Sequence, residues 1–214
     1  MWIAAALPSA LAAATLEERL AQIGPAARAR MQPSFASSGL AYPPQRVLLL
    51  GLKSERRLEV YAGGASGPLR RLRVYLVHAA SGTLGPKLRE GDRQVPEGFY
   101  RVAGLNPNSQ YHVALRLDYP NAADRARARA EGRENLGGDI MIHGSNVSIG
   151  CLAMGDEVAE ELFVLAADVS LERVRVVLSP IDFRRREPPS DRQAPWVLSL
   201  YGEIRRELAT LPRR

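Results

Sequence analysis

Short apolar segments separated by glycine and proline constrain the fold of this chain more than any other feature of its sequence. A compact apolar run at 46–52 is followed by two segments, 57–61 and 72–76, in which apolar and other residues alternate. Glycine and proline at 63–68 mark a turn between the two alternating segments. Because successive side chains of a strand point to opposite faces, we expect this region to form the hairpins of an antiparallel sheet.

The rest of the chain is predicted to extend this sheet and to add helices, giving a mainly β domain with flanking helices. Asp156 is expected to cap the middle helix, whereas Gly24-Pro25 should kink the first helix or end it early. Residues 31–45 and the segment around Pro188-Pro189 are predicted linkers, and 119–138 fits either a short helix or an exposed excursion. The predicted strands are 99–105, 111–118, 139–143 and 173–178, and the predicted helices are 16–30, 156–169 and 195–211.

The charge of the chain indicates an anionic partner. The formal net charge is +6 and the pI is about 9.9, but the arginines are scattered and accompany no DNA- or RNA-binding motif. Bacterial cell wall is an anionic polymer that fits as well as nucleic acid, and we expect no nucleic-acid partner. No segment reaches the roughly 20 apolar residues that a membrane span requires.

The only cysteine, Cys151, closes a glycine-rich stretch that begins at His143. A thiol becomes a nucleophile when a nearby base takes its proton, so this pair predicts cysteine catalysis. Gly150 leaves the approach to the sulfur free of side-chain bulk, and backbone N–H groups of the turn can point at a developing oxyanion. No acidic residue follows His143 directly, so the nearest carbonyl, that of Gly144, is the expected partner of the imidazole.

A metal site is the alternative for a histidine–cysteine pair. Such a site needs at least three ligands, and only His78 and His112 are available besides carboxylates. We therefore expect neither a metal nor a cofactor. A single cysteine also excludes a disulfide within the chain.

Three stretches of the sequence carry a resemblance to one protein family. They are 81–100, from Ser-Gly-Thr-Leu-Gly-Pro-Lys to Glu-Gly-Phe-Tyr; 105–112 together with 119–124; and 143–151, from His-Gly to Ser-Ile-Gly-Cys. In these stretches the chain resembles the L,D-transpeptidase (YkuD) catalytic domain, specifically its YafK-like branch. Weaker similarity runs from Gly39 to Val60 and reaches Phe183 and Trp196, so that the resemblance extends over nearly the whole chain after residue 30.

The resemblance implies a mixed, β-sandwich-like catalytic domain that acts on the stem peptides of peptidoglycan. It implies that Cys151 is the nucleophile, that His143 is the general base and that the Gly144 carbonyl holds the imidazole. The N–H groups near Gly150 and Cys151 would form the oxyanion hole, with Ser148 fixing the turn through its hydroxyl. An acyl-enzyme on the cysteine would then pass to an amine or to water, and acylation by carbapenems is a trait of the family.

Three further residues are candidates for binding the stem peptide. Lys87 and Arg89 lie in a glycine-rich loop and can bind carboxylates, although a solvated charged loop is the alternative. His112 shares one face of a predicted strand with Arg116, and this face can border the cleft. Tyr111 and Val113 lie on the opposite face of the same strand.

Two positions beside the cysteine depart from the broader family. Ile149 stands where that family has a histidine, and Ala153 stands where it commonly has an arginine for the substrate carboxylate. The spacing from His143 to Cys151 is also shorter than in typical cross-linking members. These features agree with the YafK-like branch, which is associated with cleaving the link between peptidoglycan and an attached outer-membrane lipoprotein. A transpeptidase, a hydrolytic amidase that releases lipoprotein, and a non-catalytic wall-binding module therefore all stay open.

The N-terminus and the domain plan complete the expectations. The alanine-rich start resembles an export signal, but Arg19 is the first basic residue, so a truncated gene start and a plain hydrophobic N-terminus are the alternatives. We expect export to the periplasm of a Gram-negative bacterium. The predicted organisation is a signal-like or hydrophobic segment at 1–14, a helix and linker at 15–45, the catalytic domain at 46–180, and a linker and helix at 181–214.

Overall fold

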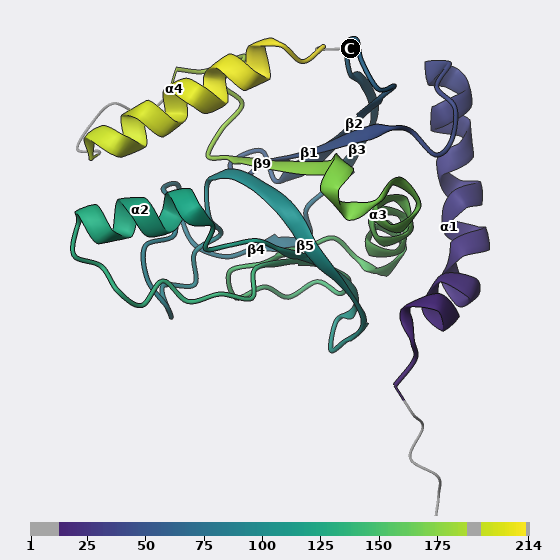
Figure 1. The fold of residues 1–214 in the computed structure, drawn as a ribbon, viewed down its shortest axis with the longest axis horizontal. Coiled ribbons are helices and arrows are strands. Elements are labelled where there is room, and N and C mark those ends of the chain that lie inside the picture. The colour runs from purple at the N-terminus through teal and green to yellow at the C-terminus, as the bar shows by residue number, and fades with distance from the viewer. Residues whose placement is uncertain (1–12, 188–193, 213–214) are drawn as a thin grey trace, which may run out of the picture.

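The computed structural model describes residues 13–187 and 194–212, and these form helices packed around a curled sheet (Figure 1). Residues 1–12, which hold most of the predicted signal-like start, and Pro188-Pro189 of the predicted linker lie outside the described residues. The helices are α1 (Leu16–Ser38), α2 (Ala122–Ala130), α3 (Asp156–Val169) and α4 (Pro195–Ala209). The strands are β1 (Arg46–Leu52), β2 (Arg57–Gly63), β3 (Arg70–Leu76), β4 (Ala79–Ala80), β5 (Gly98–Ser109), β6 (His112–Leu117), β7 (Met141–His143), β8 (Leu152–Ala153) and β9 (Val174–Ser179).

The sheet is curled, and its two outermost strands follow one another in the sequence. Its strand order is β3-β2-β1-β9-β5-β6-β7-β8-β4, so β3 and β4 are the outer strands. Only Val77 and His78 separate these two strands in the sequence. Strand β5 joins the two halves, because its first residues pair with β9 and its later residues pair with β6. The β1–β9 and β7–β8 pairs are parallel and the others antiparallel. The predicted fold class, a mixed β-sandwich-like domain with flanking helices, is confirmed.

Strand β1 is buried on both faces because helices cover both sides of the sheet at this point. Val47 and Leu49 belong to the core beneath α1 and α3, whereas Leu48 and Leu50 belong to a second core beneath α4. Burial of an aliphatic side chain contributes about 1.5–3 kcal/mol, so each core stabilises the helix that covers it. The compact apolar run of the sequence is therefore the central strand, with bounds equal to those predicted.

Helix α1 continues where the sequence predicts a break. The prediction that Gly24-Pro25 ends this helix early is wrong, and so is the predicted linker over residues 31–38, since Pro25 and Pro33 both lie inside α1. A proline inside a helix costs about 3 kcal/mol, and the large side chains that α1 buries at intervals of four residues offset this cost. The helix ends at Gly39, whose left-handed φ of 66° closes the last turn. Its buried residues are Ile23, Gly24, Ala27, Met31 and Phe35.

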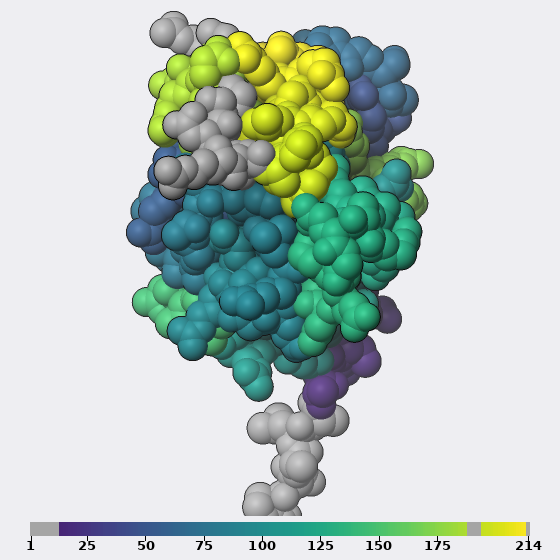
Figure 2. Space-filling view, turned by 90° about the vertical axis from the view of Figure 1, so that its left-hand side faces the viewer, coloured from purple at the N-terminus to yellow at the C-terminus, as the bar shows by residue number. Residues whose placement is uncertain are grey.

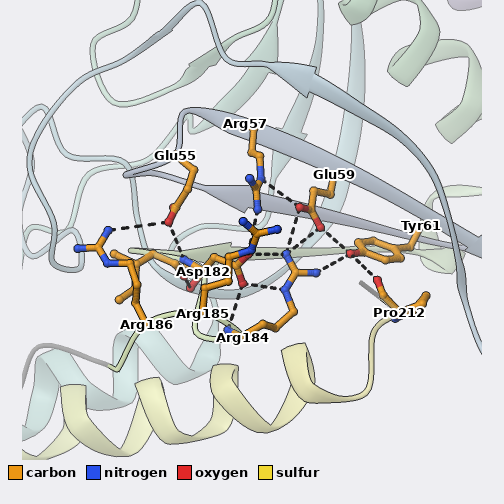
Figure 3. Close-up of polar contacts among 11 residues, drawn as sticks. Glu55, Arg57, Glu59, Tyr61, Asp182, Arg184, Arg185, Arg186 and Pro212 are labelled. Atoms are coloured by element: carbon orange, nitrogen blue, oxygen red, sulfur yellow. Dashed lines mark hydrogen bonds and ion pairs between the residues drawn. The ribbon is translucent and has the colours of Figure 1, made fainter. Parts of the chain in front are cut away.

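A network of buried charges attaches the segment before α4 to β2 (Figure 3). The guanidinium of Arg184 lies 3.0 Å from Glu59 and 2.7 Å from Asp182. The three side chains are only 1–4% exposed. Arg57 adds a second cation, 2.9 Å from Asp182, and Tyr61 donates its hydroxyl to Glu59. Both carboxylates of the network, Glu59 and Asp182, have cationic partners. The network therefore holds residues 182–184, which precede α4 in the chain, against the sheet.

Candidate active site

The parallel pairing of β7 with β8 places His143 and Cys151 on one face of the sheet. His143 lies opposite Ala153 in this pairing, and continuing the register places Cys151 opposite Met141. Because alternate residues of a strand share a face, the imidazole and the thiol point to the same side. Residues 144–150 connect the two strands, and we call this connection the 144–150 turn. The thiol of Cys151 is partly buried and donates a hydrogen bond to the carbonyl of Asp139 at 3.6 Å.

The imidazole of His143 is held in one tautomer. Its Nδ1 lies 2.6 Å from the carbonyl oxygen of Gly144, and the side chain is buried. A carbonyl oxygen only accepts hydrogen bonds, so Nδ1 carries the proton and the lone pair of the neutral ring is on Nε2. Burial lowers the pKa of His143, and the hydrogen bond to Gly144 opposes that shift. The site therefore holds a neutral imidazole whose Nε2 can accept a proton.

The thiol of Cys151 is also neutral at rest. Burial raises its pKa, and the charge of Asp139 adds to this shift. A hydrogen bond from the backbone of Met141 and the charge of Lys87 act in the opposite direction. The pKa directions of Cys151 and His143 thus favour a thiol beside an imidazole over a preformed thiolate–imidazolium pair.

Gly144 has no room for a side chain. A Cβ at this position would lie 2.5 Å from Oδ1 of Asp156 and 2.7 Å from the backbone oxygen of Tyr111. Asp156 was predicted to cap α3, and this is wrong: Gly155 is the N-cap residue, and the Asp156 carboxylate instead accepts the N–H of Ser145 at 2.8 Å. The start of the 144–150 turn is therefore packed between α3 and the β5–β6 connection.

Tyr111 is a site residue that the sequence did not reveal. Its ring stacks on the His143 imidazole, with the ring centroids 4.7 Å apart and an angle of 27° between the planes. Tyr111 lies in the turn between β5 and β6 and is 36% exposed, unlike the buried Val113 of the same predicted face. The stacked ring covers one side of the imidazole and limits its rotation. The only local signal for this role is the aromatic residue at a strand turn.

The two predicted oxyanion donors are occupied by serine hydroxyls. The N–H of Gly150 donates to Oγ of Ser81 at 2.6 Å, and the N–H of Cys151 donates to Oγ of Ser148 at 3.1 Å. The Ser148 hydroxyl in turn donates to the carbonyl of Cys151 at 2.6 Å, so Ser148 closes the turn around the nucleophile candidate. The φ of Gly150 is +104°, a conformation that favours glycine at this position. An oxyanion can use these N–H groups only if the hydroxyls move or share them.

The structure separates the three candidates for substrate binding. Lys87 is buried, and its ammonium donates to the carbonyl of Arg89 at 2.8 Å and to Asp92 at 2.6 Å. His112 is held through Nε2, 2.8 Å from the Glu160 carboxylate of α3. Lys87 is therefore engaged inside the protein, whereas His112 is partly exposed and is held by its contact with Glu160. Arg89 is exposed on the rim of a cavity.

A buried ion pair fixes the loop at 81–97, which connects β4 to β5. The ammonium of Lys53 donates to the carbonyls of Gly85 and Val95 and to the carboxylate of Glu97, each at 2.9 Å. Glu97 is fully buried and accepts the hydroxyl of Tyr201 at 2.7 Å. The loop is thereby anchored to the sheet and to α4. Its serine at position 81 contacts the residue before Cys151, so this anchoring also supports the candidate nucleophile.

Neither a metal cluster nor a membrane-spanning helix occurs in the part of the chain that the structure describes. Within residues 13–187 and 194–212, no group of three or more histidine, cysteine, aspartate or glutamate side chains could hold a metal ion. The helices of the same residues are too short or too polar to cross a bilayer.

Comparison with known proteins identifies a family and two groups of relatives. The family model of the L,D-transpeptidase catalytic domain matches residues 46–177, more than half of the 214 residues. YafK of Escherichia coli strain K12 is 43% identical over 113 residues, which are 52% of this chain and 43% of that protein. YafK of Escherichia coli O157:H7 gives the same values. The chain therefore spans less than half the length of the curated relatives it matches.

Two solved structures are also similar to this chain. The helical cell shape determining protein Pgp2 from Campylobacter jejuni is 27% identical, with a TM-score of 0.49 over 66% of this chain and 50% of that one. L,D-transpeptidase 1 from Mycobacterium tuberculosis is 16% identical, with a TM-score of 0.36 over 63% of this chain and 62% of that one.

Proposed function

The chain belongs to the family of L,D-transpeptidase catalytic domains, and from this premise we propose that it is a peptidoglycan-modifying enzyme whose nucleophile is the thiol of Cys151. The observation that supports the proposal is that the register of β7 and β8 directs this thiol to the same face of the sheet as the buried, neutral His143. Cys151 is the only cysteine of the chain, so a thiol mechanism has a single candidate.

The first step is general-base attack. Because the thiol rests in its protonated form, its proton passes to Nε2 of His143 as Sγ attacks the carbonyl carbon of a stem-peptide bond. The hydrogen bond from Nδ1 to Gly144 stabilises the imidazolium that forms. The C–N bond then breaks, the imidazolium proton goes to the leaving amine, and a thioester remains on Cys151.

The second step returns the enzyme to its starting state. An amine or a water molecule attacks the thioester carbonyl and gives its proton to Nε2 of His143, and Sγ of Cys151 leaves and regains a proton. Transpeptidation and hydrolysis therefore use the same two side chains and differ only in the acceptor. Transfer to an amine is the proposed activity, and hydrolytic release of a peptidoglycan-linked outer-membrane lipoprotein is the alternative.

The oxyanion of both steps needs N–H donors near the sulfur. The N–H groups of Gly150 and Cys151 are adjacent to it, and each is bonded to a serine hydroxyl. Since the carbonyl oxygen of a bound substrate becomes a stronger acceptor as charge develops on it, we propose that it displaces Ser148 or Ser81 from these donors. Action on peptidoglycan further implies export, and we propose the periplasm as the compartment.

Digestion of isolated sacculi tests this function. Sacculi with and without bound lipoprotein are incubated with the protein, and the products are analysed by mass spectrometry. New cross-links support transpeptidation, and released lipoprotein supports the amidase. A Cys151→Ala variant that keeps either activity would exclude Cys151 as the nucleophile. Acylation by a carbapenem, read from the mass of the intact protein, tests the thiol independently of the acceptor. An adduct on the parent protein that Cys151→Ala lacks supports Cys151 as the nucleophile. A parent protein that forms no adduct favours a non-catalytic wall-binding module.

A further inference from the structure

A cavity of about 640 Å³ lies between the 81–97 loop and residues 131–140, which lead from α2 to β7. Figure 2 shows these two segments side by side on one face of the molecule, below α4. Its volume lies within the range of about 300–1,000 Å³ that is usual for sites that bind small ligands. Its lining includes Pro86, Leu88, Arg89, Gln94, Arg133 and Glu134.

Two hydrogen bonds align the walls of this cavity. The guanidinium of Arg133 donates to the carbonyl of Leu88 at 2.9 Å, and the N–H of Glu90 donates to the carbonyl of Asn135 at 2.9 Å. Arg89 lies between the two contacts on one segment, and residue 134 lies between them on the other. The two contacts thus place Arg89 and Glu134 on facing walls, and both residues line the cavity.

Arg89 and Glu134 are the charges of this lining that stay available to a ligand. Arg133 is paired with Glu131 at 2.7 Å, and Asp92 is paired with Lys87 at 2.6 Å. Arg89 and Glu134 are exposed, and neither forms an ion pair with any residue in 13–187 or 194–212. A cation and an anion that line one cavity are complementary to a ligand that carries both a carboxylate and an ammonium group.

The cavity is close to the proposed nucleophile. Gln94 is part of its lining, and the Gln94 carbonyl oxygen lies 3.5 Å from the position that a Cβ on Gly150 would take. On the other wall, the segment that carries Glu134 continues to Asp139, whose carbonyl accepts the thiol hydrogen bond of Cys151. Both walls of the cavity therefore continue into the backbone that contacts Gly150 and Cys151.

We propose that this cavity is a subsite for a zwitterionic amino-acid group of the substrate, with Arg89 binding the carboxylate and Glu134 binding the ammonium. The inference rests on the proposed function, which makes a peptidoglycan stem peptide the ligand. A guanidinium binds a carboxylate through two parallel hydrogen bonds, which fixes its orientation. The second contact, to Glu134, discriminates against peptides whose amino group is blocked, so the pair selects the residue that is presented to the thiol.

Binding of chemically modified stem peptides tests this subsite. Soluble fragments released from sacculi are prepared in native, N-acetylated and carboxyl-amidated forms, and their affinities are measured by calorimetry in a Cys151→Ala background, where turnover does not interfere. Arg89→Gln is expected to weaken binding of the native fragment about tenfold and to leave the amidated fragment unaffected. Glu134→Gln is expected to weaken the native fragment about tenfold and to leave the acetylated fragment unaffected. Arg206→Gln and Glu203→Gln, which change exposed charges on α4, are the matched controls and should bind like the background protein.

The subsite is excluded if acetylation and amidation leave the affinity unchanged, if both variants lose affinity for all three forms alike, or if no fragment binds. These outcomes are separate from failure of the proposed function, which is read from the action of the parent protein on sacculi. If the parent protein cleaves or cross-links sacculi but the background protein binds all three forms equally, the proposed function stands and the subsite is excluded.

Discussion

The hydroxyl of Tyr201 in α4 donates to the carboxylate of Glu97 at 2.7 Å, across 104 positions of the chain. The other oxygen of Glu97 accepts from the ammonium of Lys53 and from the N–H of Gly85. Tyr201 lies outside the residues 46–177 that match the family model, yet it completes the contacts of the carboxylate that anchors the 81–97 loop. An element beyond the matched region therefore supports the proposed site.

Tyr201→Phe should lower stability by about 1–3 kcal/mol, because it leaves a fully buried carboxylate oxygen of Glu97 without its hydrogen bond. Urea unfolding followed by circular dichroism measures the change. Tyr111→Phe is the matched control, since the hydroxyl of Tyr111 has no hydrogen bond within the described residues, and it should leave the unfolding midpoint unchanged. Equal midpoints for Tyr201→Phe and the parent protein would show that the contact contributes nothing.

The pH dependence of activity should follow the lowered pKa of His143. General-base attack requires the neutral imidazole, so kcat/KM falls only when the pH drops below the pKa of this residue. We expect the acid limb below the ordinary histidine value of about 6.5. His78→Gln, which changes an exposed histidine, should leave the limb in place. An acid limb at or above about 6.5 would contradict the assignment.

Stability should also depend on His143 in the acid range. Its folded-state pKa is lowered, so the unfolded chain binds a proton first and protonation favours unfolding. Above the pKa of histidine in the unfolded chain, about 6.5, this destabilising effect of His143 is absent. The free energy of unfolding falls as the pH drops from that value to the folded-state pKa. Unfolding midpoints measured against pH should therefore decline in this window and decline less in His143→Gln. Parallel profiles for the two proteins would refute the linkage.

The local pattern predicted the strands and the thiol–imidazole pair because both depend on residues close in sequence. Strand β1 has its predicted bounds, since alternate residues of its apolar run meet a core on each face. The continuation of helix α1 past residue 30 could not be predicted, because the packing that offsets its prolines involves α3, more than a hundred residues away. The stacking of Tyr111 on His143 and the contacts of Glu97 could not be predicted either, because their partners are far apart in the sequence and come together only in the curled sheet.

Arg184→Met should destabilise the protein by about 3–5 kcal/mol, because it leaves the buried carboxylates of Glu59 and Asp182 short of a cationic partner. Thermal and urea unfolding measure the effect. Arg185→Met is the matched control: its side chain is 72% exposed and lies 3.7 Å from Asp182, so its loss should cost less than about 1 kcal/mol. Similar losses in the two variants would mean that burial of the network does not determine its energy.

Gly144→Ala should inactivate the enzyme while leaving the fold intact. A Cβ at this position would lie 2.7 Å from the backbone oxygen of Tyr111, which cannot move as a side chain can, so the carbonyl that holds His143 must shift. A misplacement of about 1 Å in a catalytic group can cost about 100-fold in rate, and we expect a loss of this size in carbapenem acylation of Cys151. Gly104→Ala is the control, because no atom lies within 4 Å of the added Cβ, and it should acylate at the parent rate. Acylation of Gly144→Ala at the parent rate would show that the position of the Gly144 carbonyl does not govern the base.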